Sequence, residues 1–492
     1  MNIKLLLLIF YYFIYPIKSD YTSWYQSLEE NSFENEDYDP EAYKITHVYK
    51  TICECIRGGN QTLKCGAQDL KNANLIVPKE VGPIAIAHLE RNSITYLFKN
   101  KILPGQEKSL LLLDLSDNKI TDIEPGAFDN FVNLLELKVT KNNLDELSDD
   151  IFTKYLSSLH QLYLDDNFLN KLDVGVFDNL KNLKKLILDG NRNLKINKNV
   201  LSSSLSNLEV LSLDSCHLEK LDDDLFENLP NLRALSLSGN PLRTLPKAIS
   251  PEKLPKLEIL VLSDTYLEVL NKEELGLAVP NLKKLYMRRN RYLKRIDNCA
   301  FCGLKQLETI DFSDSKSLNE IDLNAFGKSP PKELKQINLN NCNFSSLHEG
   351  TLKNVYWSTM QRLRIDGNPW NCDCQLKWLM QNENAMRTAS EKVEPKCKSP
   401  ENVKGKTLYE AKENLKCGLP INNNSGISSM SKTMVMMILM ILGSAIFIFS
   451  ILFARKHLPE MFSDEFDEEN ENIVEPSNTV VTLRDGVPQS VI

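Results

Sequence analysis

Catalytic motifs are missing from this chain of 492 residues. It has only six histidines, and none is spaced from another as metal ligands usually are. A nucleophile elbow, a phosphate-binding loop and a zincin helix are all absent from the sequence. We therefore expect the protein to be no enzyme and to need neither a cofactor nor a metal ion.

A basic region for nucleic acid is also missing. The formal net charge is −8, and the excess of acid lies at the two ends. Residues 20–50 hold eight acids against two bases, and residues 455–492 hold nine acids against three bases. The segment between them is nearly neutral, so it offers no electrostatic surface for a phosphate backbone, and we expect no nucleic-acid partner.

Long apolar runs are few, and only two matter. Residues 5–14 follow Lys4 and come before the small Ser19, which indicates a signal peptide over residues 1–19 because the run is too short to span a bilayer. Residues 434–454 carry no charge over 21 positions, which predicts one transmembrane helix over residues 433–454. The bases that follow it place the C-terminus in the cytoplasm, so we expect a single-pass type I protein of the plasma membrane.

The middle of the chain repeats one pattern of leucines. Residues 110–118 (LLLLDLSDN), 159–167 (LHQLYLDDN), 183–191 (LKKLILDGN) and 232–240 (LRALSLSGN) share the frame L-x-x-L-x-L-x-x-N, which is the leucine-rich repeat. Twelve frames begin at residues 84, 110, 134, 159, 183, 208, 232, 257, 282, 307, 334 and 360. The pattern predicts an α/β horseshoe solenoid over residues 84–367, with a concave parallel β-sheet and an irregular or short-helical convex side.

Two further positions of the repeat have structural roles. The ninth position lies where the chain leaves the strand, so its side chain should satisfy backbone groups of the turn. Eight repeats place asparagine there: Asn92, Asn118, Asn142, Asn167, Asn191, Asn240, Asn290 and Asn368. On the convex side a phenylalanine recurs, and we interpret Phe128, Phe152, Phe177 and Phe226 as core residues.

The stretch NPWNCDCQLKWL (residues 368–379) follows the last repeat. With it, the chain resembles the extracellular leucine-rich-repeat proteins with cysteine-rich caps, such as Slit, Toll-like receptors and neuronal adhesion proteins. Spacing alone leaves three pairings open among Cys372, Cys374, Cys397 and Cys417. The resemblance implies that Cys372 pairs with Cys397 and Cys374 with Cys417, in a C-terminal cap over residues 368–417. A zinc site is the alternative, but one residue between the first two cysteines is shorter than the usual two to four.

The N-terminal cap departs from the family pattern. We place it at residues 53–83, where the family usually has four cysteines and this chain has Cys53, Cys55 and Cys65. We expect all three to take part in disulfides, although the total of 11 cysteines is odd and leaves at least one without an intrachain partner.

Four more cysteines lie inside the array. Cys299 and Cys302 belong to a convex loop, where either a local disulfide or two structural thiols would fit. Cys216 and Cys342 occupy the ninth position of their repeats, and we interpret them as buried thiols.

The concave face can be read from the frame, because the variable positions of each strand point away from the core. Its middle is apolar, with Tyr163 and Tyr286 at the margins of Ile187, Val210, Ala234, Ile259 and Val261. Such a patch is typical of protein interfaces, while the alternative is that β-branched residues simply favour strands. Beside it, residues 283–295 (KKLYMRRNRYLKR) are basic, which indicates either a solvated surface or a site for an anionic glycan or acidic partner. We assign ligand binding to Tyr163, Ile187, Val210, Ile259, Val261, Tyr286, Arg288 and Arg289.

The regions outside the array carry weaker signals. Residues 20–52 form an acidic, tyrosine-rich leader that we expect to be disordered, with Tyr38 as a candidate for sulfation. Glycosylation sequons stand at Asn60, Asn343 and Asn423. A juxtamembrane linker over residues 418–432 precedes the membrane helix. The acidic tail, residues 455–492, ends with Ser490 and Ile492 in the pattern that a cytoplasmic PDZ scaffold binds.

These features together predict a cell-surface adhesion or recognition protein that binds an extracellular or cell-surface protein through its concave face. One alternative is a non-catalytic co-receptor that modulates another receptor. The other is a matrix protein released by shedding near residues 421–431 (INNNSGISSMS).

Overall fold

The computed structural model describes residues 43–46, 52–56, 61–353, 355–389, 393–415 and 417. The chain divides into two units, Met1–Cys417 and Gly418–Ile492, and all described residues lie in the first. Some predictions fall outside the described residues: the signal peptide, Tyr38, Asn60, Asn423, the linker, the transmembrane helix and the tail with Ser490 and Ile492. Within the described ranges, no helix is both long enough and apolar enough to cross a membrane.

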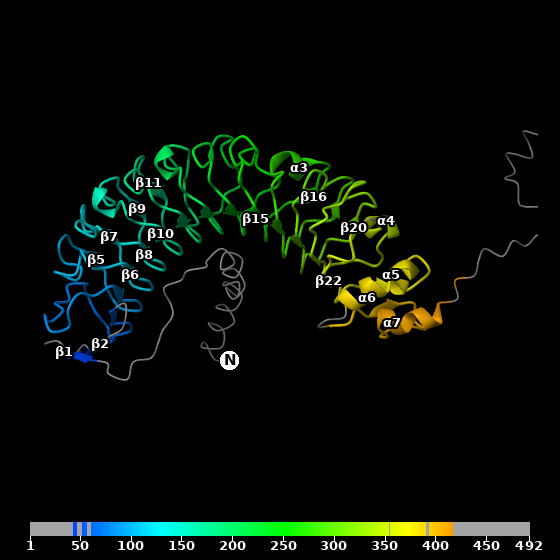
Figure 1. Cartoon of the computed structure of the whole chain (residues 1–492), viewed down its shortest axis with the longest axis horizontal. Helices are drawn as coiled ribbons and strands as arrows, with labels where there is room; N and C mark the ends of the chain where they lie inside the picture. Colours follow the sequence, from blue (N-terminus) through cyan, green and yellow to red (C-terminus); the bar gives the residue numbers. More distant parts are fainter. Residues whose placement is uncertain are drawn as a thin grey trace, which may run out of the picture. The chain divides into compact units, whose positions relative to one another are not determined.

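A single sheet of fifteen strands lines the inner side of the repeat array (Figure 1). Each of the twelve predicted frames contributes one three-residue strand, at its third to fifth positions, and neighbouring strands of the array pair in parallel. These strands are β4 (Ile86–His88), β6 (Leu112–Asp114), β8 (Glu136–Lys138), β10 (Gln161–Tyr163), β12 (Lys185–Ile187), β13 (Val210–Ser212), β14 (Ala234–Ser236), β15 (Ile259–Val261), β17 (Lys284–Tyr286), β19 (Thr309–Asp311), β21 (Gln336–Asn338) and β22 (Arg362–Arg364). The prediction of a concave parallel sheet is therefore confirmed.

The core of the solenoid consists of the frame leucines stacked from one repeat to the next. Leu186, Leu211 and Leu235 are register partners on neighbouring strands, and none has any exposed surface. The convex phenylalanines are buried as predicted, and the ring of Phe152 stacks 6.3 Å from that of Phe128 and 6.2 Å from that of Phe177. No repeat could bury these side chains alone, so each is stabilised by its neighbours.

The ninth-position asparagines hold successive turns together. The side-chain oxygen of Asn191 accepts the N–H of Leu169 at 3.0 Å, and its amide nitrogen donates to the carbonyl of Leu164 at 3.1 Å and to that of Leu188 at 2.8 Å. Asn118, Asn142, Asn167 and Asn240 make the same kinds of bond. The predicted role in satisfying turn backbone groups is confirmed.

The convex side contains more strand than the sequence suggested. Two-residue strands form three small parallel sheets there: β5 (Tyr96–Leu97) with β7 (Asp122–Ile123), β9 (Glu146–Leu147) with β11 (Lys171–Leu172), and β16 (Val269–Leu270), β18 (Arg295–Ile296) and β20 (Glu320–Ile321). The expected helices are few and short: η2 (Lys154–Leu156), η3 (Ser203–Leu205), α3 (Glu274–Ala278) and α4 (Glu349–Leu352).

The N-terminal end corrects one prediction. We expected disorder through residue 52, but β1 (Tyr43–Thr46) pairs antiparallel with β2 (Ile52–Ile56), which pairs antiparallel with β3 (Thr62–Lys64). The strand β3 then pairs in parallel with β4, so these three strands extend the main sheet. The acidic composition of residues 20–50 obscured the short segment YKIT, whose β-branched residues suit a strand.

The C-terminal cap closes the other end of the array. It contains β23 (Trp370–Asn371), β24 (Cys397–Ser399), the helices α5 (Lys377–Gln381), α6 (Glu383–Ala389) and α7 (Leu408–Ala411), and the short helix η4 (Lys412–Asn414). Cys372 is bonded to Cys397 and Cys374 to Cys417, the pairs that the resemblance implied. These cysteines therefore have a structural role.

The other cysteines differ in part from expectation. Cys53 is bonded to Cys65, while Cys55 is buried and belongs to none of the four disulfides of the described residues, which corrects its assignment. The antiparallel register of β2 and β3 places Cys55 opposite Leu63, and by the same register Cys53 lies opposite Cys65. Cys299 and Cys302 form a local disulfide, one of the two options left open.

Cys216 and Cys342 are buried thiols, as interpreted. The thiol of Cys216 donates to the carbonyl of Leu188 at 3.3 Å, and that of Cys342 to the carbonyl of Phe312 at 3.1 Å. Burial raises the pKa of both, to about 12 for Cys342. A protonated thiol can replace the asparagine amide as a donor here, which explains cysteine at the ninth position.

Candidate ligand-binding surface

The apolar residues predicted for the concave face form one cluster. Strand pairing places them side by side on the four adjacent strands β12 to β15, and they are separate from the main core. We call Ile187, Val210, Ala234, Ile259 and Val261, together with the flanking Tyr163 and Tyr286, the concave cluster. The structure thus unites residues that are up to 123 positions apart in the sequence, from Tyr163 to Tyr286.

The aliphatic side chains of the concave cluster are more buried than we expected for residues that contact a ligand. Ile187 is 2% exposed and Val261 is 3% exposed, so the aliphatic members contribute little free area. Strands about 4.8 Å apart bring side chains of equal register into contact, which covers part of each one. Tyr163 and Tyr286 are only partly buried and form the accessible margins.

Each tyrosine of the margin is held by charged neighbours. The hydroxyl of Tyr163 donates to Gln161 at 2.6 Å, and the ammonium groups of Lys138 and Lys185 lie 5.7 Å and 5.0 Å from its ring centre. At the other margin, the guanidinium of Arg288 lies 5.5 Å from the ring centre of Tyr286. Both rings are thereby fixed before any ligand arrives, which lowers the entropy cost of binding.

The basic segment beside the cluster is largely neutralised. Arg288 Nε lies 2.8 Å from Asp311 Oδ2, and Arg289, whose φ is +54°, lies 3.1 Å from Asp264. The segment is therefore not an uncompensated positive patch, because its bases face acids. Three further pairs of the same kind are Lys283 with Glu258, Lys294 with Glu268 and Arg295 with Asp297.

A row of carboxylates runs along the edge of the same strands. Asp189 Oδ1 accepts the N–H of Asp214 at 2.8 Å, and Asp214 Oδ1 accepts the N–H of Ser238 at 2.7 Å and the hydroxyl of Ser236. Burial, and then the nearby Asp214, raise the pKa of Asp189 well above its usual range. Burial raises the pKa of Asp214 to about 7, although the hydrogen bonds from Ser236 and Ser238 oppose the shift.

Replacing Asp214 with asparagine is expected to stabilise the protein above pH 7 and to change little near pH 4. An acid whose pKa rises on folding stabilises the folded state while it is protonated, and that stability is lost between its unfolded value, about 4, and its folded value, about 7. A difference of one pKa unit between the folded and unfolded states corresponds to about 1.4 kcal/mol. The asparagine oxygen can still accept both hydrogen bonds. Thermal melts across this pH range check the expectation.

The exposed Asp223 provides the matched control for this change. Replacing Asp223 with asparagine should change the melting temperature little, since this side chain keeps its contact with water on folding. An Asp214→Asn protein with the wild-type pH profile would contradict the assignment.

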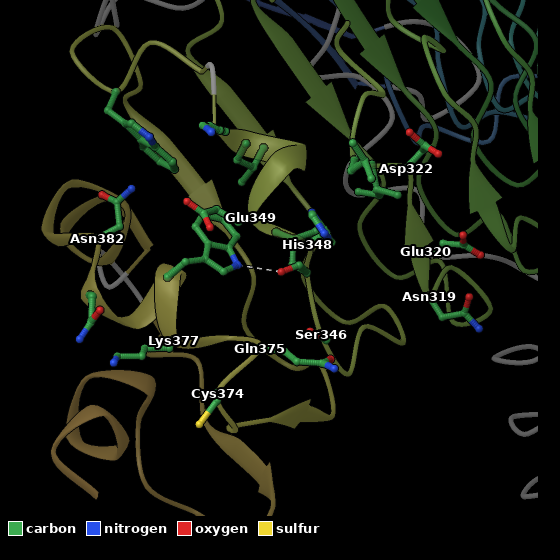
Figure 2. Close-up of a pocket in the computed structure, with 18 residues that line it drawn as sticks. Asn319, Glu320, Asp322, Ser346, His348, Glu349, Cys374, Gln375, Lys377 and Asn382 are labelled. Carbon is green, nitrogen blue, oxygen red and sulfur yellow. Dashed lines mark hydrogen bonds between the residues drawn. The ribbon is translucent and has the colours of Figure 1, made fainter. Parts of the chain in front are cut away.

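One hollow was not foreseen from the sequence. It has a volume of about 1140 Å³ and lies where the last repeats meet the C-terminal cap (Figure 2). Glu320 of β20, His348 before α4 and Lys377 of α5 face it, as does Trp378, whose indole N–H donates to the carbonyl of Leu347 at 2.8 Å. Its lining comes from three separate segments, so no single motif announces it.

The remaining predicted site within the described residues is the sequon at Asn343. This residue is exposed in the turn after β21, as a glycosylated asparagine must be.

The fold identifies the protein as a parallel β-solenoid of stacked coils. Its inner sheet presents the residues at the variable positions of the repeat, between the frame leucines. Models described as "Leucine rich repeat" match residues 88–144, 132–192 and 206–267, and one described as "BspA type Leucine rich repeat region (6 copies)" matches residues 279–364. The chain belongs to the leucine-rich-repeat family. Proteins of this family generally mediate protein–protein recognition, and their solenoids are typically not catalytic.

Individual relatives are distant. The chain is 31% identical over 103 residues to "Leucine-rich repeat-containing protein 3B" of Bos taurus and of Mus musculus, which is 21% of this chain and 37% of each relative's length. Among solved structures, the Toll–Spätzle complex of Drosophila aligns with a TM-score of 0.52 and 16% identity, over 67% of this chain and 50% of that one. An internalin of Listeria monocytogenes aligns with a TM-score of 0.47 and 19% identity, over 63% of this chain and 82% of that one. At 16% identity the match to the Toll–Spätzle complex shows the fold alone.

Proposed function

We propose that the chain is a cell-surface recognition protein that binds a protein ligand across the inner face of strands β10 to β17. The observation that carries this proposal is the concave cluster, a second apolar cluster outside the core with a fixed aromatic ring at each margin. The concave cluster is not needed for the core of the solenoid, which lies on the other side of the sheet. Aromatic side chains held in place by their neighbours are enriched at protein–protein interfaces.

The ligand would contact the two tyrosines and the partly exposed Arg288. Arg288 is held between Asp311 and the ring of Tyr286, so it is positioned rather than free to move. Because the neighbouring ion pairs neutralise the basic segment, we propose a contact of mixed polarity and not one driven by a strongly acidic ligand.

Anchoring by one transmembrane helix, with the repeats outside the cell, belongs to the same proposal. Its support is the uncharged run at residues 434–454 and the disulfides that fix the repeat array and its caps, since disulfides persist in oxidising compartments. The binding of a PDZ scaffold by the last residues stays a prediction from the sequence.

Adhesion and co-receptor activity give different results in transfected cells. If the protein is an adhesion molecule, cells that display the full chain should aggregate with each other or with cells that carry the ligand. The double variant Tyr163→Ala/Tyr286→Ala should lower the avidity of aggregation at least about tenfold, because each anchor is expected to contribute more than about 1 kcal/mol. Full surface expression without aggregation, together with co-precipitation of a second receptor, would favour the co-receptor and contradict adhesion.

A further inference from the structure

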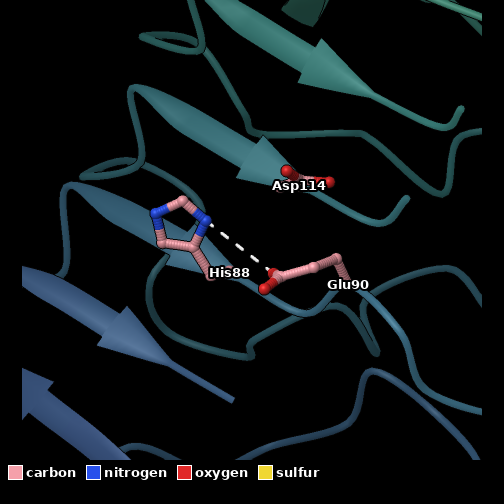
Figure 3. Close-up of side chains that lie close together, drawn as sticks. All are labelled: His88, Glu90 and Asp114. Carbon is pink, nitrogen blue, oxygen red and sulfur yellow. Dashed lines mark ion pairs between the residues drawn. The ribbon is translucent and has the colours of Figure 1, made fainter. Parts of the chain in front are cut away.

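Three side chains at the N-terminal end of the main sheet converge on one point. His88 of β4 and Asp114 of β6 are register partners, and Glu90 follows His88 by two residues, so all three lie on the inner side of the array (Figure 3). One donor atom from each can be chosen so that all lie within 4.8 Å of one another. The spacing of the histidines in the sequence does not reveal this group, because its other two members are carboxylates. Asp114 comes from the neighbouring strand, and Glu90 comes from the residues that follow β4.

The hydrogen bonding of these groups leaves room for a cation. Glu90 Oε2 is buried and has no hydrogen-bond donor, and it lies 3.8 Å from Nδ1 of His88. Asp114 Oδ1 accepts the N–H of Ser116 at 2.8 Å, which orients the carboxylate and leaves its other oxygen to bind. A buried carboxylate oxygen without a partner is costly, and a bound cation would remove that cost.

We propose that His88, Glu90 and Asp114 form a binding site for a divalent cation of the zinc class. One imidazole nitrogen and two carboxylates are a zinc donor set, whereas Ca²⁺ and Mg²⁺ prefer oxygen alone. Around a tetrahedral Zn²⁺ such donors lie about 3.3 Å apart, so side-chain movements of about 1 Å would close the site. With His88 and Glu90 26% and 23% exposed, solvent reaches the fourth position, which a water or a ligand side chain can occupy.

Two basic residues near the cluster bear on its affinity. Lys138 is the register partner of Asp114, but its ammonium lies 3.0 Å from Glu136 and is thereby neutralised. The guanidinium of Arg91 lies 3.7 Å from Glu90 Oε1, so it competes with a cation for that carboxylate. Removing the charge of Arg91 should therefore tighten metal binding, a result that a purely structural His88–Glu90 contact does not produce.

Calorimetric titration of the purified full-length chain with ZnCl₂ tests the proposal. We expect one ion bound with micromolar or tighter affinity, and no binding of MgCl₂ or CaCl₂ under the same conditions. His88→Ala and the isosteric Glu90→Gln should each weaken zinc binding at least about tenfold, and Arg91→Met should strengthen it. Replacing His160, whose Nδ1 contacts the carbonyl of Ser158, with alanine is the matched control and should change nothing.

Co²⁺ provides a second readout that does not depend on folding stability. Visible absorption bands of tetrahedral Co²⁺ should appear with the wild-type chain and disappear with Glu90→Gln. Zinc affinity that is unchanged in both His88→Ala and Glu90→Gln would overturn the proposal, as would the absence of binding to the wild-type chain. These outcomes are independent of whether the concave cluster binds a protein.

Discussion

Replacing Trp370 with alanine is expected to lower the free energy of unfolding by about 4 kcal/mol. The indole has no exposed surface, it stacks on Phe344 with ring centres 6.3 Å apart, and its N–H donates to the carbonyl of Ile365 at 2.9 Å. Alanine would leave a cavity between the last repeat and the cap, while the carbonyl of Ile365 would keep only its bond from the Asn368 amide. Urea denaturation followed by circular dichroism measures the loss.

The cap contains a matched control at Tyr409. This residue of α7 is 59% exposed, so Tyr409→Ala should change the free energy of unfolding by less than about 0.5 kcal/mol. If Trp370→Ala were as mild, the cap could not be packed on the array through this side chain.

Asn191→Ala is expected to cost about 3 kcal/mol or more. It removes the bond accepted from the N–H of Leu169 and the three bonds donated to the carbonyls of Leu164, Leu188 and Asp189. The carbonyls of Leu164 and Leu188 keep their bonds from Asn167 and Cys216, so the N–H of Leu169 is the group left without a partner. Asn191 has no exposed surface, so water cannot replace the amide, and the unsatisfied N–H of Leu169 alone costs about 1–3 kcal/mol beyond the lost bonds. Because the bonds join two repeats, we expect a broader urea transition as cooperativity between neighbours falls.

Asn193, two residues further along, is exposed and serves as the control. Asn193→Ala should leave both the midpoint and the steepness of the urea transition unchanged. Equal effects of the two alanine variants would show that the ninth-position asparagine is not what joins the turns.

The repeat frame could be predicted from the sequence because its physical cause is periodic. The third to fifth positions of all twelve frames form a strand, since burial of leucine at fixed intervals determines the register as well as the fold. The small convex sheets were missed because a strand of two residues, such as Tyr96–Leu97, has no detectable period.

The candidate surfaces were predictable only in part. The frame shows that Ile187 and Val261 face inward on the same sheet, but it does not show how much of each side chain the neighbouring strands cover. Likewise, the acids that neutralise Arg288 and Arg289 are Asp311 of β19 and Asp264 of a turn, 23 and 25 residues away, so a charge count over a short window misses them. The cluster of His88, Glu90 and Asp114 also depends on pairing between strands.

The central claim is that the inner face of strands β10 to β17 recognises a protein. A screen of the fragment of residues 20–430 against surface and secreted proteins would identify the ligand, and its affinity would then be compared among three proteins. The tyrosine variant Tyr163→Ala/Tyr286→Ala alters the margins of the concave cluster, whereas Phe168→Ala/Leu277→Ala alters side chains that are 62% and 70% exposed outside the inner sheet. We predict that the tyrosine variant loses at least about thirtyfold in affinity, since each anchor contributes more than about 1 kcal/mol, and that the other variant binds as the wild type does. The proposed binding surface would be contradicted if the tyrosine variant bound the ligand with wild-type affinity and the Phe168→Ala/Leu277→Ala variant lost affinity.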